Sequence, residues 1–248
     1  MTQQSQAVED VVQVTNASAT SRYVLVCEHA SHHIPSAYGT LGLAPKERYS
    51  HAAWDPGALG MAKHLATALN AKLVAGAVSR LVYDINRPAG ASDAVPSQSE
   101  QIAVPGNVGL SASDIAERER TFYRPFKAAL TRALDATAQP VLITLHSFTP
   151  VYHAQHREVE IGILHHNDRR LADALLRLST QHSKHLVRRN EPYGPADGVT
   201  HTLAVHGEPR GCPNVMIEVR NDLLATPAQQ HRMGDILTGW ITAAEATL

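Results

Sequence analysis

The stretch VLVCEHASHHIP, from Val24 to Pro35, joins a short apolar run to four side chains that can bind metals. Its apolar part favours a buried β-strand over 23–27. The polar side chains that follow are Glu28, His29, His32 and His33. Surface turns are usually built from Gly, Asn, Asp or Pro, so this composition indicates a strand that delivers a functional site.

Strands alternate with helices along the rest of the chain. Runs rich in apolar and β-branched residues predict strands over 72–78, 140–148, 159–166 and 214–220, and another starting near 186, with 81–85 as an apolar continuation toward NRP. Helical spacing predicts helices over 55–69, 111–137, 169–181 and 227–244, the second kinked or divided at Pro125. This order favours a three-layer α/β fold, a single domain over 21–248 with a central, mostly parallel or mixed sheet. Residues 1–20 read as a flexible arm, and the polar segment 88–110 reads as a long loop of the kind that can form a lid.

Composition excludes several classes of protein. The chain has 248 residues, 44% of them apolar, and a formal net charge of −1, so charge gives no support for binding nucleic acid or an anionic membrane. Its N-terminus lacks the basic and apolar regions of a secretory signal, and no window is apolar enough for a membrane span. The two cysteines, Cys27 and Cys212, form no CxxC pair. We therefore expect a cytoplasmic protein, and its oligomeric state is left open.

Histidines at strand ends suggest a metal site. The chain has 15 histidines, and His29 and His146 each stand near the end of a predicted strand. In α/β sheets ligands bind at the carboxyl ends of strands, and hydrolytic zinc sites use about three His, Asp or Glu ligands. Asp55, before Pro56, is the best candidate for a third ligand. Either histidine could instead be a core residue, and Asp55 could be only a helix N-cap.

Glu218 is a candidate acid or base. It lies inside the apolar run Val215–Val219, where an ionised carboxylate rarely stays buried without a partner. It could also simply pair with Arg220 or Arg87. His32 and His33 are read as surface residues or as residues that support the site.

Six segments of the chain resemble the N-formylglutamate amidohydrolase family. They run in the family's order and cover most of residues 22–240: CEHASHHIP, WDPGALGMAKHLA, SRLVYDINRP, LITLHSFTP, DGVTHTLAVHG and GCPNVMIEVRNDLL. The resemblance implies a fold similar to that of zinc carboxypeptidases and cell-wall amidases, with a divalent metal, zinc by preference, at the strand ends. The family often has Gly and Asn, or Ser and Gly, after its first histidine, whereas this chain has Ser31 and His32, so His32 stays a possible ligand.

The resemblance also assigns roles to residues. It implies His29, Asp55 and His146 as metal ligands and Glu218 as the catalytic glutamate. Arg87 and Arg220 look like binders of a substrate carboxylate, which a guanidinium can hold with two hydrogen bonds. The other candidate substrate-binding residues, beside these positions, are Asn86, Ser31 and Ser147.

The activity implied is metal-dependent hydrolysis of an N-acyl amino acid, with N-formyl-L-glutamate yielding formate and L-glutamate as the leading candidate and histidine degradation as its setting. The partner is then a small molecule. Two alternatives stay open: another zinc hydrolase on the same scaffold, either carboxypeptidase-like or a cell-wall amidase, and a non-catalytic homologue that keeps the fold. Substrate screens and metal content would separate them.

Overall fold

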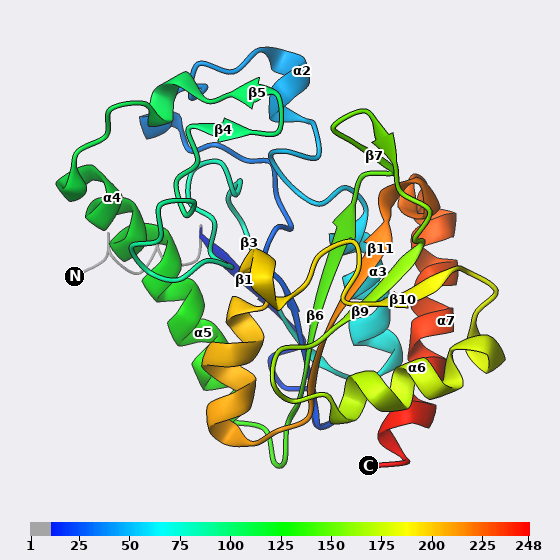
Figure 1. The fold of residues 1–248 in the computed structure, drawn as a ribbon. Coiled ribbons are helices and arrows are strands. Elements are labelled where there is room, and N and C mark those ends of the chain that lie inside the picture. Colours follow the sequence, from blue (N-terminus) through cyan, green and yellow to red (C-terminus); the bar gives the residue numbers. More distant parts are fainter. Residues whose placement is uncertain (1–10) are drawn as a thin grey trace.

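A seven-stranded sheet forms the centre of the computed structural model, which describes residues 11–248 (Figure 1). In spatial order its strands are β1 (Val12–Thr15), β3 (Lys72–Gly76), β2 (Tyr23–Cys27), β6 (Val141–Phe148), β11 (Asn214–Arg220), β9 (Ile161–Leu164) and β10 (Val187–Arg189). The four strands β3, β2, β6 and β11 are mutually parallel. β1 is antiparallel to β3, and β9 is antiparallel to β11 but parallel to β10, so the sheet is mixed.

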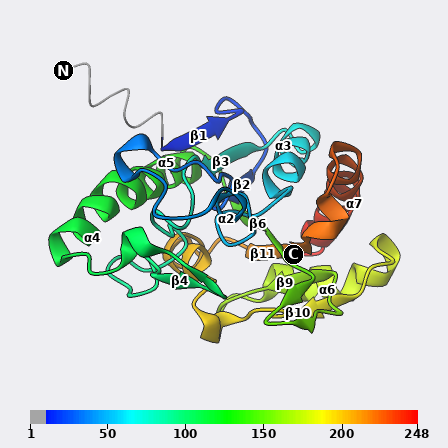
Figure 2. The same ribbon diagram turned by 90° about the horizontal axis from the view of Figure 1, so that it is seen from above.

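Helices cover both faces of this sheet (Figure 2). One face carries α3 (Ala58–Ala68), α6 (Arg170–His182) and α7 (Pro227–Glu245), and the other carries α4 (Ala112–Arg118) and α5 (Arg124–Asp135). Outside these layers lie α2 (Pro45–Arg48) and two small hairpins, β4 (Gln98–Ser99) with β5 (Ile102–Ala103), and β7 (Val151–Tyr152) with β8 (Gln155–His156). Short helical turns complete the chain: η1 (Ser36–Tyr38), η2 (Pro105–Asn107), η3 (Glu119–Tyr123), η4 (Pro195–Asp197), η5 (Leu203–Gly207), η6 (Glu208–Arg210) and η7 (Asn221–Leu224).

The central strands are apolar on both faces because each face is covered. Leu25, Ile143 and Ile217 are fully buried in the core under α3, α6 and α7. Their neighbours Leu142 and Met216 point the other way, into the core under α5. Side chains of a strand alternate between faces, so a continuous apolar run is what a doubly covered sheet requires. The expected three-layer α/β single domain is therefore confirmed.

The long helix predicted over 111–137 is divided. Ser111 caps α4, its hydroxyl accepting a hydrogen bond from the Asp114 backbone N–H. α4 then runs through η3, a stretch of π-helix, into α5, whose first turn contains Pro125. Proline cannot donate a backbone hydrogen bond, so the wider turn before it accommodates the missing bond. Among residues 11–248, no helix is both long and apolar enough to cross a membrane.

One apolar run is explained and one sequence-based expectation is corrected. The apolar continuation over 81–85 consists of turns and irregular backbone, with Leu81 and Val82 fully buried in the core under α5. Burial produced the strand-like apolar pattern without sheet pairing. The arm expected over 1–20 is ordered over 11–20, where β1 forms a sheet edge and the Lys72 ammonium donates to the Ala19 carbonyl at 2.9 Å. Residues 1–10 of the expected arm lie outside the described residues.

Candidate active site

Four of the residues singled out in the sequence meet at the carboxyl edge of the parallel strands. His29 stands two residues beyond β2, and His146 and Glu218 are register partners in β6 and β11. Asp55 comes from the loop before α3, and its backbone N–H donates to the His29 carbonyl at 2.9 Å. Adjacent strands lie about 4.8 Å apart, so the register alone places Glu218 beside His146.

His29, Asp55 and His146 form a cluster that could hold a metal ion. All three are buried, and one ligand atom of each lies within 4.8 Å of the others. The Asp55 Oδ2 is 3.5 Å from the His29 Nδ1 and 2.8 Å from the His146 Nδ1. Tetrahedral zinc with bonds of 2.0–2.1 Å separates its ligand atoms by about 3.3 Å. The two nitrogens and one carboxylate oxygen therefore fit a divalent ion, with a position left open.

Carboxylates hold the far side of both histidines. The His29 Nε2 lies 2.7 Å from the Asp84 Oδ1, and the His146 Nε2 lies 3.1 Å from the Glu28 Oε2. Neither side-chain pair is more than about one-tenth exposed. A carboxylate on one ring nitrogen selects the tautomer that turns the lone pair of the other nitrogen toward a metal. The arrangement thus directs both Nδ1 atoms to Asp55.

Asp55 is not a helix cap. The N-cap of α3 is Gly57, and no side chain caps that helix. The Asp55 carboxylate instead accepts a hydrogen bond from the Ser147 backbone N–H at 3.3 Å and forms an ion pair, through its other oxygen, with Arg80. Its side chain is 2% exposed, so the Arg80 guanidinium supplies the charge compensation that burial demands.

Charge and burial set different protonation preferences within the cluster. Burial, and then the positive charge of Arg80, lower the pKa of His29 to about 4, which keeps its ring neutral as metal ligation requires. Burial alone would raise the pKa of Asp84, but the adjacent His29 holds it well below its usual range. Burial also acts to raise the pKa of Glu28, but nearby His146 lowers it by more, so the pKa of Glu28 lies below its ordinary value.

Glu218 differs from these carboxylates because, among residues 11–248, no histidine or arginine lies within ion-pair distance of it. Its Oε2 is buried and makes no hydrogen bond within the described residues, and neither Arg220 nor Arg87 forms an ion pair with it there. Burial raises the pKa of Glu218, although nearby His146 and Arg80 act against this. A buried carboxylate with a raised pKa at a cavity wall is suited to accepting and returning a proton.

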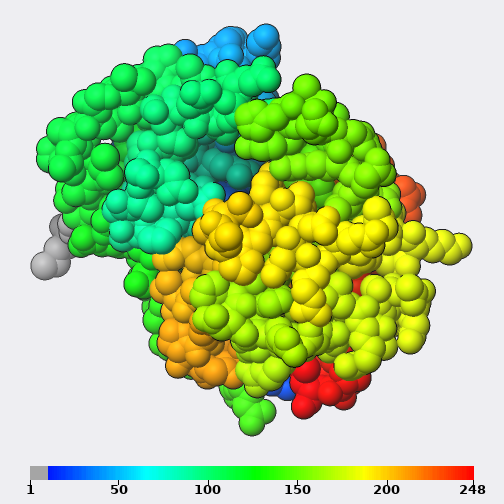
Figure 3. Space-filling model, in the orientation of Figure 1, coloured from blue at the N-terminus to red at the C-terminus, as the bar shows by residue number. Residues whose placement is uncertain are grey.

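A cavity of about 530 Å³ opens above these groups and is lined by His29, Asp55, His146 and Glu218. Figure 3 shows the hollow between residues of the β4–β5 region, of the β7–β8 hairpin and of the segment around 190–200. Its volume lies within the range of about 300–1,000 Å³ typical of small-molecule sites.

The segment 88–110, read as a loop, contributes a wall of this cavity. It contains the β4–β5 hairpin, whose turn residue Glu100 reaches two other segments. The Glu100 carboxylate lies 3.0 Å from the His51 Nε2 and accepts a hydrogen bond from the His153 backbone N–H at 2.8 Å. His153 stands in the turn of the β7–β8 hairpin, so one side chain joins both hairpins at the rim.

Arg220 does not line the cavity. Its guanidinium lies 2.9 Å from Asp222 and donates to the carbonyls of Arg157 and Glu158 at 3.0 and 3.3 Å. The expected role of Arg220 as a direct carboxylate binder is therefore corrected, because its N–H groups already donate to Asp222 and to the backbone before β9. Arg87 does line the cavity, but it pairs with Asp93 at 3.0 Å.

The remaining polar candidates have structural partners. Asn86 lines the cavity, yet its side-chain amide donates to the Val199 carbonyl at 2.6 Å and its oxygen accepts from Thr202. The Ser147 hydroxyl donates to the Pro56 carbonyl at 2.8 Å, which fastens the Asp55 loop to β6. Ser31, two residues after His29 in the sequence, does not line the cavity.

Ser31 and His32 lie outside the cavity lining. The Ser31 hydroxyl accepts a hydrogen bond from the His33 backbone N–H at 3.0 Å. The His32 ring packs against Tyr49 and Trp54, with centroids 4.8 and 5.0 Å apart. Within residues 11–248, His32 is not part of the metal-competent cluster.

Four further residues line the cavity or flank the metal-competent cluster, and the sequence patterns predict no role for them. They are Glu28, Asp84, Arg80 and Arg157. Asp84 and Arg80 lie within the segment SRLVYDINRP, so a strand-end search widened to that segment would have included them. Arg157 follows β8 in a short exposed hairpin, and no local pattern marks it.

His165 and His166 lie at the opposite edge of the sheet. They follow β9, so they too stand at the end of a predicted strand. Because β9 is antiparallel to β11, its carboxyl end faces away from Glu218. The His166 Nδ1 contacts Glu208 at 2.7 Å there.

Comparison with known proteins identifies relatives. The family model described as N-formylglutamate amidohydrolase matches residues 21–225. The crystal structure of gene product Atu2144 from Agrobacterium tumefaciens shares 47% identity over 98% of this chain and 97% of that chain, with a TM-score of 0.91. An N-formylglutamate amidohydrolase from Ralstonia eutropha JMP134 has 16% identity over 96% of this chain and all of its own, with a TM-score of 0.67, and therefore shares the fold.

A metallo-carboxypeptidase from Burkholderia cenocepacia is more distant, at 10% identity and a TM-score of 0.46 over 98% of this chain and 68% of that chain. No curated protein matches the chain. The family match spans well over half of the 248 residues, so the chain belongs to the N-formylglutamate amidohydrolase family, whose members are hydrolases acting on an amide.

Proposed function

We propose that this member of the N-formylglutamate amidohydrolase family hydrolyses N-formyl-L-glutamate to formate and L-glutamate. The observation that carries the proposal is the buried carboxylate of Glu218, which forms no ion pair within residues 11–248, beside the cluster of His29, Asp55 and His146, all lining one cavity. Amide hydrolysis at neutral pH needs an activated water, a proton acceptor and a donor to the leaving nitrogen.

His29, Asp55 and His146 would hold a divalent ion, and we favour zinc because imidazole and carboxylate ligands with one open position are typical of hydrolytic zinc sites. Such an ion, when bound, supplies Lewis acidity to a carbonyl oxygen and lowers the pKa of a water molecule. The carboxylates of Asp84 and Glu28 keep the two rings oriented for this task.

Glu218 moves the proton. In the proposed reaction its carboxylate accepts a proton from the attacking water and returns it to the amide nitrogen as the C–N bond breaks. Burial supports this role because it raises the pKa of Glu218. The proton affinity of the carboxylate is then closer to those of the water and the amide nitrogen with which it exchanges the proton.

Arg80 is the proposed donor to the developing oxyanion. Its guanidinium lies in the cavity, and it is held beside Asp55 by an ion pair. A fixed cation at this position stabilises negative charge that grows on the carbonyl oxygen without having to reorganise. Replacing Arg80 by Met should lower kcat more than it raises KM.

The test is formate release by zinc-loaded protein, compared between wild type and Glu218→Gln. The variant should keep its metal, since Glu218 is not one of the cluster's ligands, and lose about 10²- to 10⁴-fold in kcat. Glu117→Gln, the same change at an exposed position on α4, is the matched control and should leave turnover unchanged. Near-full activity in Glu218→Gln would refute the assigned role.

A substrate panel tests the reaction itself. N-formyl-L-glutamate, N-acetyl-L-glutamate and a dipeptide such as Gly-Glu should be offered to protein loaded with zinc or manganese. Preference for the formyl compound is expected. Release of amino acid only from the dipeptide would favour a peptidase, and absence of turnover with all three would overturn the proposal.

A further inference from the structure

Three arginines line the cavity, and two of them already have carboxylate partners. Arg80 is paired with Asp55. Arg87 lies 3.0 Å from Asp93 and donates to the Asp197 carbonyl at 2.8 Å. The charge of each of these two guanidinium groups is therefore already offset by a carboxylate of the protein, although the Arg80 Nε makes no hydrogen bond with the described residues.

Arg157 is the exception. Within residues 11–248 no carboxylate lies within ion-pair distance of it. Its Nη1 donates to the Tyr193 hydroxyl at 2.8 Å and approaches the Thr149 carbonyl at 3.5 Å. Its Nε and Nη2 make no hydrogen bond with the described residues, which leaves one edge of the guanidinium free.

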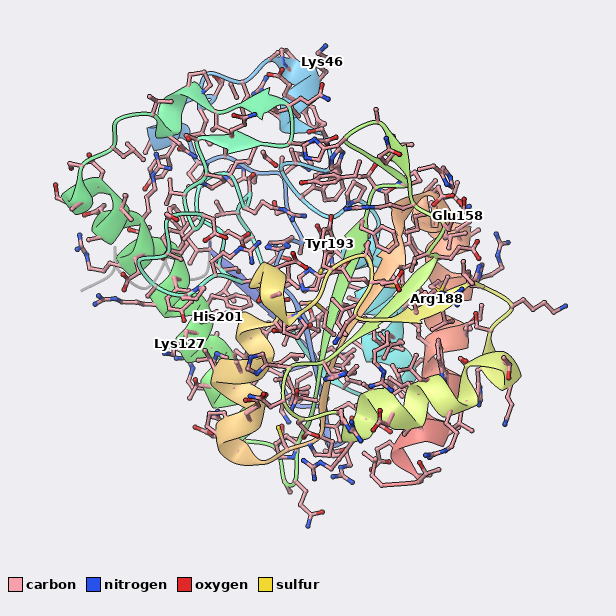
Figure 4. All side chains as sticks on the ribbon, in the orientation of Figure 1. Lys46, Lys127, Glu158, Arg188, Tyr193 and His201 are labelled. Atoms are coloured by element: carbon pink, nitrogen blue, oxygen red, sulfur yellow. The ribbon has the colours of Figure 1, made fainter. Side chains whose placement is uncertain are left out.

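Aromatic rings hold this free cation in place. The Arg157 Cζ lies 4.3, 4.7 and 5.7 Å from the ring centroids of Tyr152, Tyr193 and Phe148. The faces of these rings attract the guanidinium and restrict its orientation, but they do not neutralise its charge. In Figure 4 the labelled Tyr193 lies toward the centre of the molecule, in the region where the cavity opens.

The backbone of Arg157 is fixed as well. Its N–H donates to the Pro150 carbonyl at 2.8 Å, and its carbonyl accepts from the Arg220 Nη1 at 3.0 Å. Arg220 is in turn anchored on Asp222. The arginine at the end of β11 thus positions Arg157 instead of meeting the substrate itself.

We propose that Arg157 binds a carboxylate of the amino-acid part of the substrate and is the residue that makes the enzyme selective for acidic N-acyl amino acids. This inference rests on the proposed function. A planar guanidinium with a free edge can bind a carboxylate through two parallel hydrogen bonds, and the surrounding rings reduce the freedom lost on binding. Glu218 shares the cavity, so an anionic substrate needs such a cation to offset repulsion.

The experiment measures kcat/KM of zinc-loaded protein for N-formyl-L-glutamate and for its two mono-amides, N-formyl-L-glutamine and N-formyl-L-isoglutamine. In wild type, at least one amide should be about 10- to 100-fold poorer than the diacid, as expected for loss of a charged hydrogen-bonded pair. In Arg157→Gln the diacid should lose a similar factor, and the gap to that amide should close.

Two further variants sharpen the result. Arg157→Lys keeps the charge without the planar fork and should fall between wild type and Arg157→Gln. Arg188→Gln makes the same change at an exposed arginine of β10, which Figure 4 shows at the outer side of the sheet, and should keep the wild-type gap. Thermal melting of each variant checks that the fold is intact.

The inference is overturned if Arg157→Gln keeps the wild-type gap for both amides, or if wild type accepts both amides as well as the diacid. If wild type hydrolyses none of these compounds, the proposed function fails, and Arg157 is tested by calorimetric binding of glutarate. Binding about 10- to 100-fold weaker in Arg157→Gln than in Arg188→Gln would support its role, and equal binding would refute it.

Discussion

Replacing Asp84 by Asn should weaken metal binding without removing a metal ligand. The Asp84 Oδ1 lies 2.7 Å from the His29 Nε2, and the two side chains are 10% and 7% exposed. Asn keeps an acceptor oxygen of similar shape but removes the negative charge that makes His29 a stronger ligand. A hydrogen bond to a charged group is worth about 1.5–3 kcal/mol, which corresponds to roughly 10- to 100-fold in zinc affinity. Losses of about the same size are typical when such supporting carboxylates are changed.

Zinc affinity can be measured by competition with a chromophoric chelator at pH 7.5, together with thermal melting of the metal-free proteins. Asp93→Asn is the matched control, since Asp93 also lines the cavity but is 57% exposed and pairs with Arg87 rather than with a histidine. Its zinc affinity should match that of wild type. If Asp84→Asn binds zinc as tightly as wild type, the carboxylate behind His29 does not support a metal site.

Two further predictions concern stability. Burial, and then the charge of Arg210, lower the pKa of His206 to about 4, so the folded state resists its protonation. The contribution of neutral His206 to the free energy of unfolding is fully present above the unfolded pKa of about 6.5. This contribution is lost as pH falls toward 4, and the loss amounts to about 2 kcal/mol at pH 5. His206→Gln should therefore reduce the drop in urea midpoint between pH 7 and pH 5, and an unchanged drop would contradict this. Gly57 has φ +82°, and an added Cβ would lie 2.5 Å from the Leu224 Cβ, whereas Gly90 has φ +77° with nothing within 4 Å. Gly90→Ala should therefore lower the free energy of unfolding by about 1 kcal/mol, and Gly57→Ala should lower it by roughly 1–3 kcal/mol more. Equal melting temperatures of the two variants would show that the contact with Leu224 does not destabilise the Gly57→Ala variant.

The sequence was most informative where chemistry coincides with the end of a strand. His29, His146 and Glu218 stand at or near the ends of apolar runs, and parallel strands bring such positions to one edge. The same reasoning applied to His165 would place it at the wrong end of the sheet, because an apolar run does not reveal whether its strand is parallel or antiparallel to its neighbour. Strand direction depends on connections and packing that no local pattern contains.

Arginines were harder to assign than histidines. Arg220 follows a buried strand, yet Asp222, two residues later, and a carbonyl 63 residues away engage its guanidinium. Arg157 gains its setting from Tyr193, 36 residues further along the chain. A long flexible side chain can reach several partners, so its function is decided by tertiary contacts and not by its place in a pattern.

The buried carboxylates of this sheet edge divide into two kinds by their partners alone. Asp84 and Glu28 each face a histidine, and their pKa values are lowered even though burial acts in the opposite direction. Glu218 occupies an equally buried position near His146 but forms no ion pair among the described residues, and its pKa is raised. A carboxylate that stays ionised can orient a metal ligand through the whole reaction, whereas one that gains a proton easily can carry it from water to the leaving nitrogen. Exchanging these surroundings, for example by giving Glu218 a neighbouring cation, would stabilise the ionised form and remove the proton affinity on which the proposed catalysis depends.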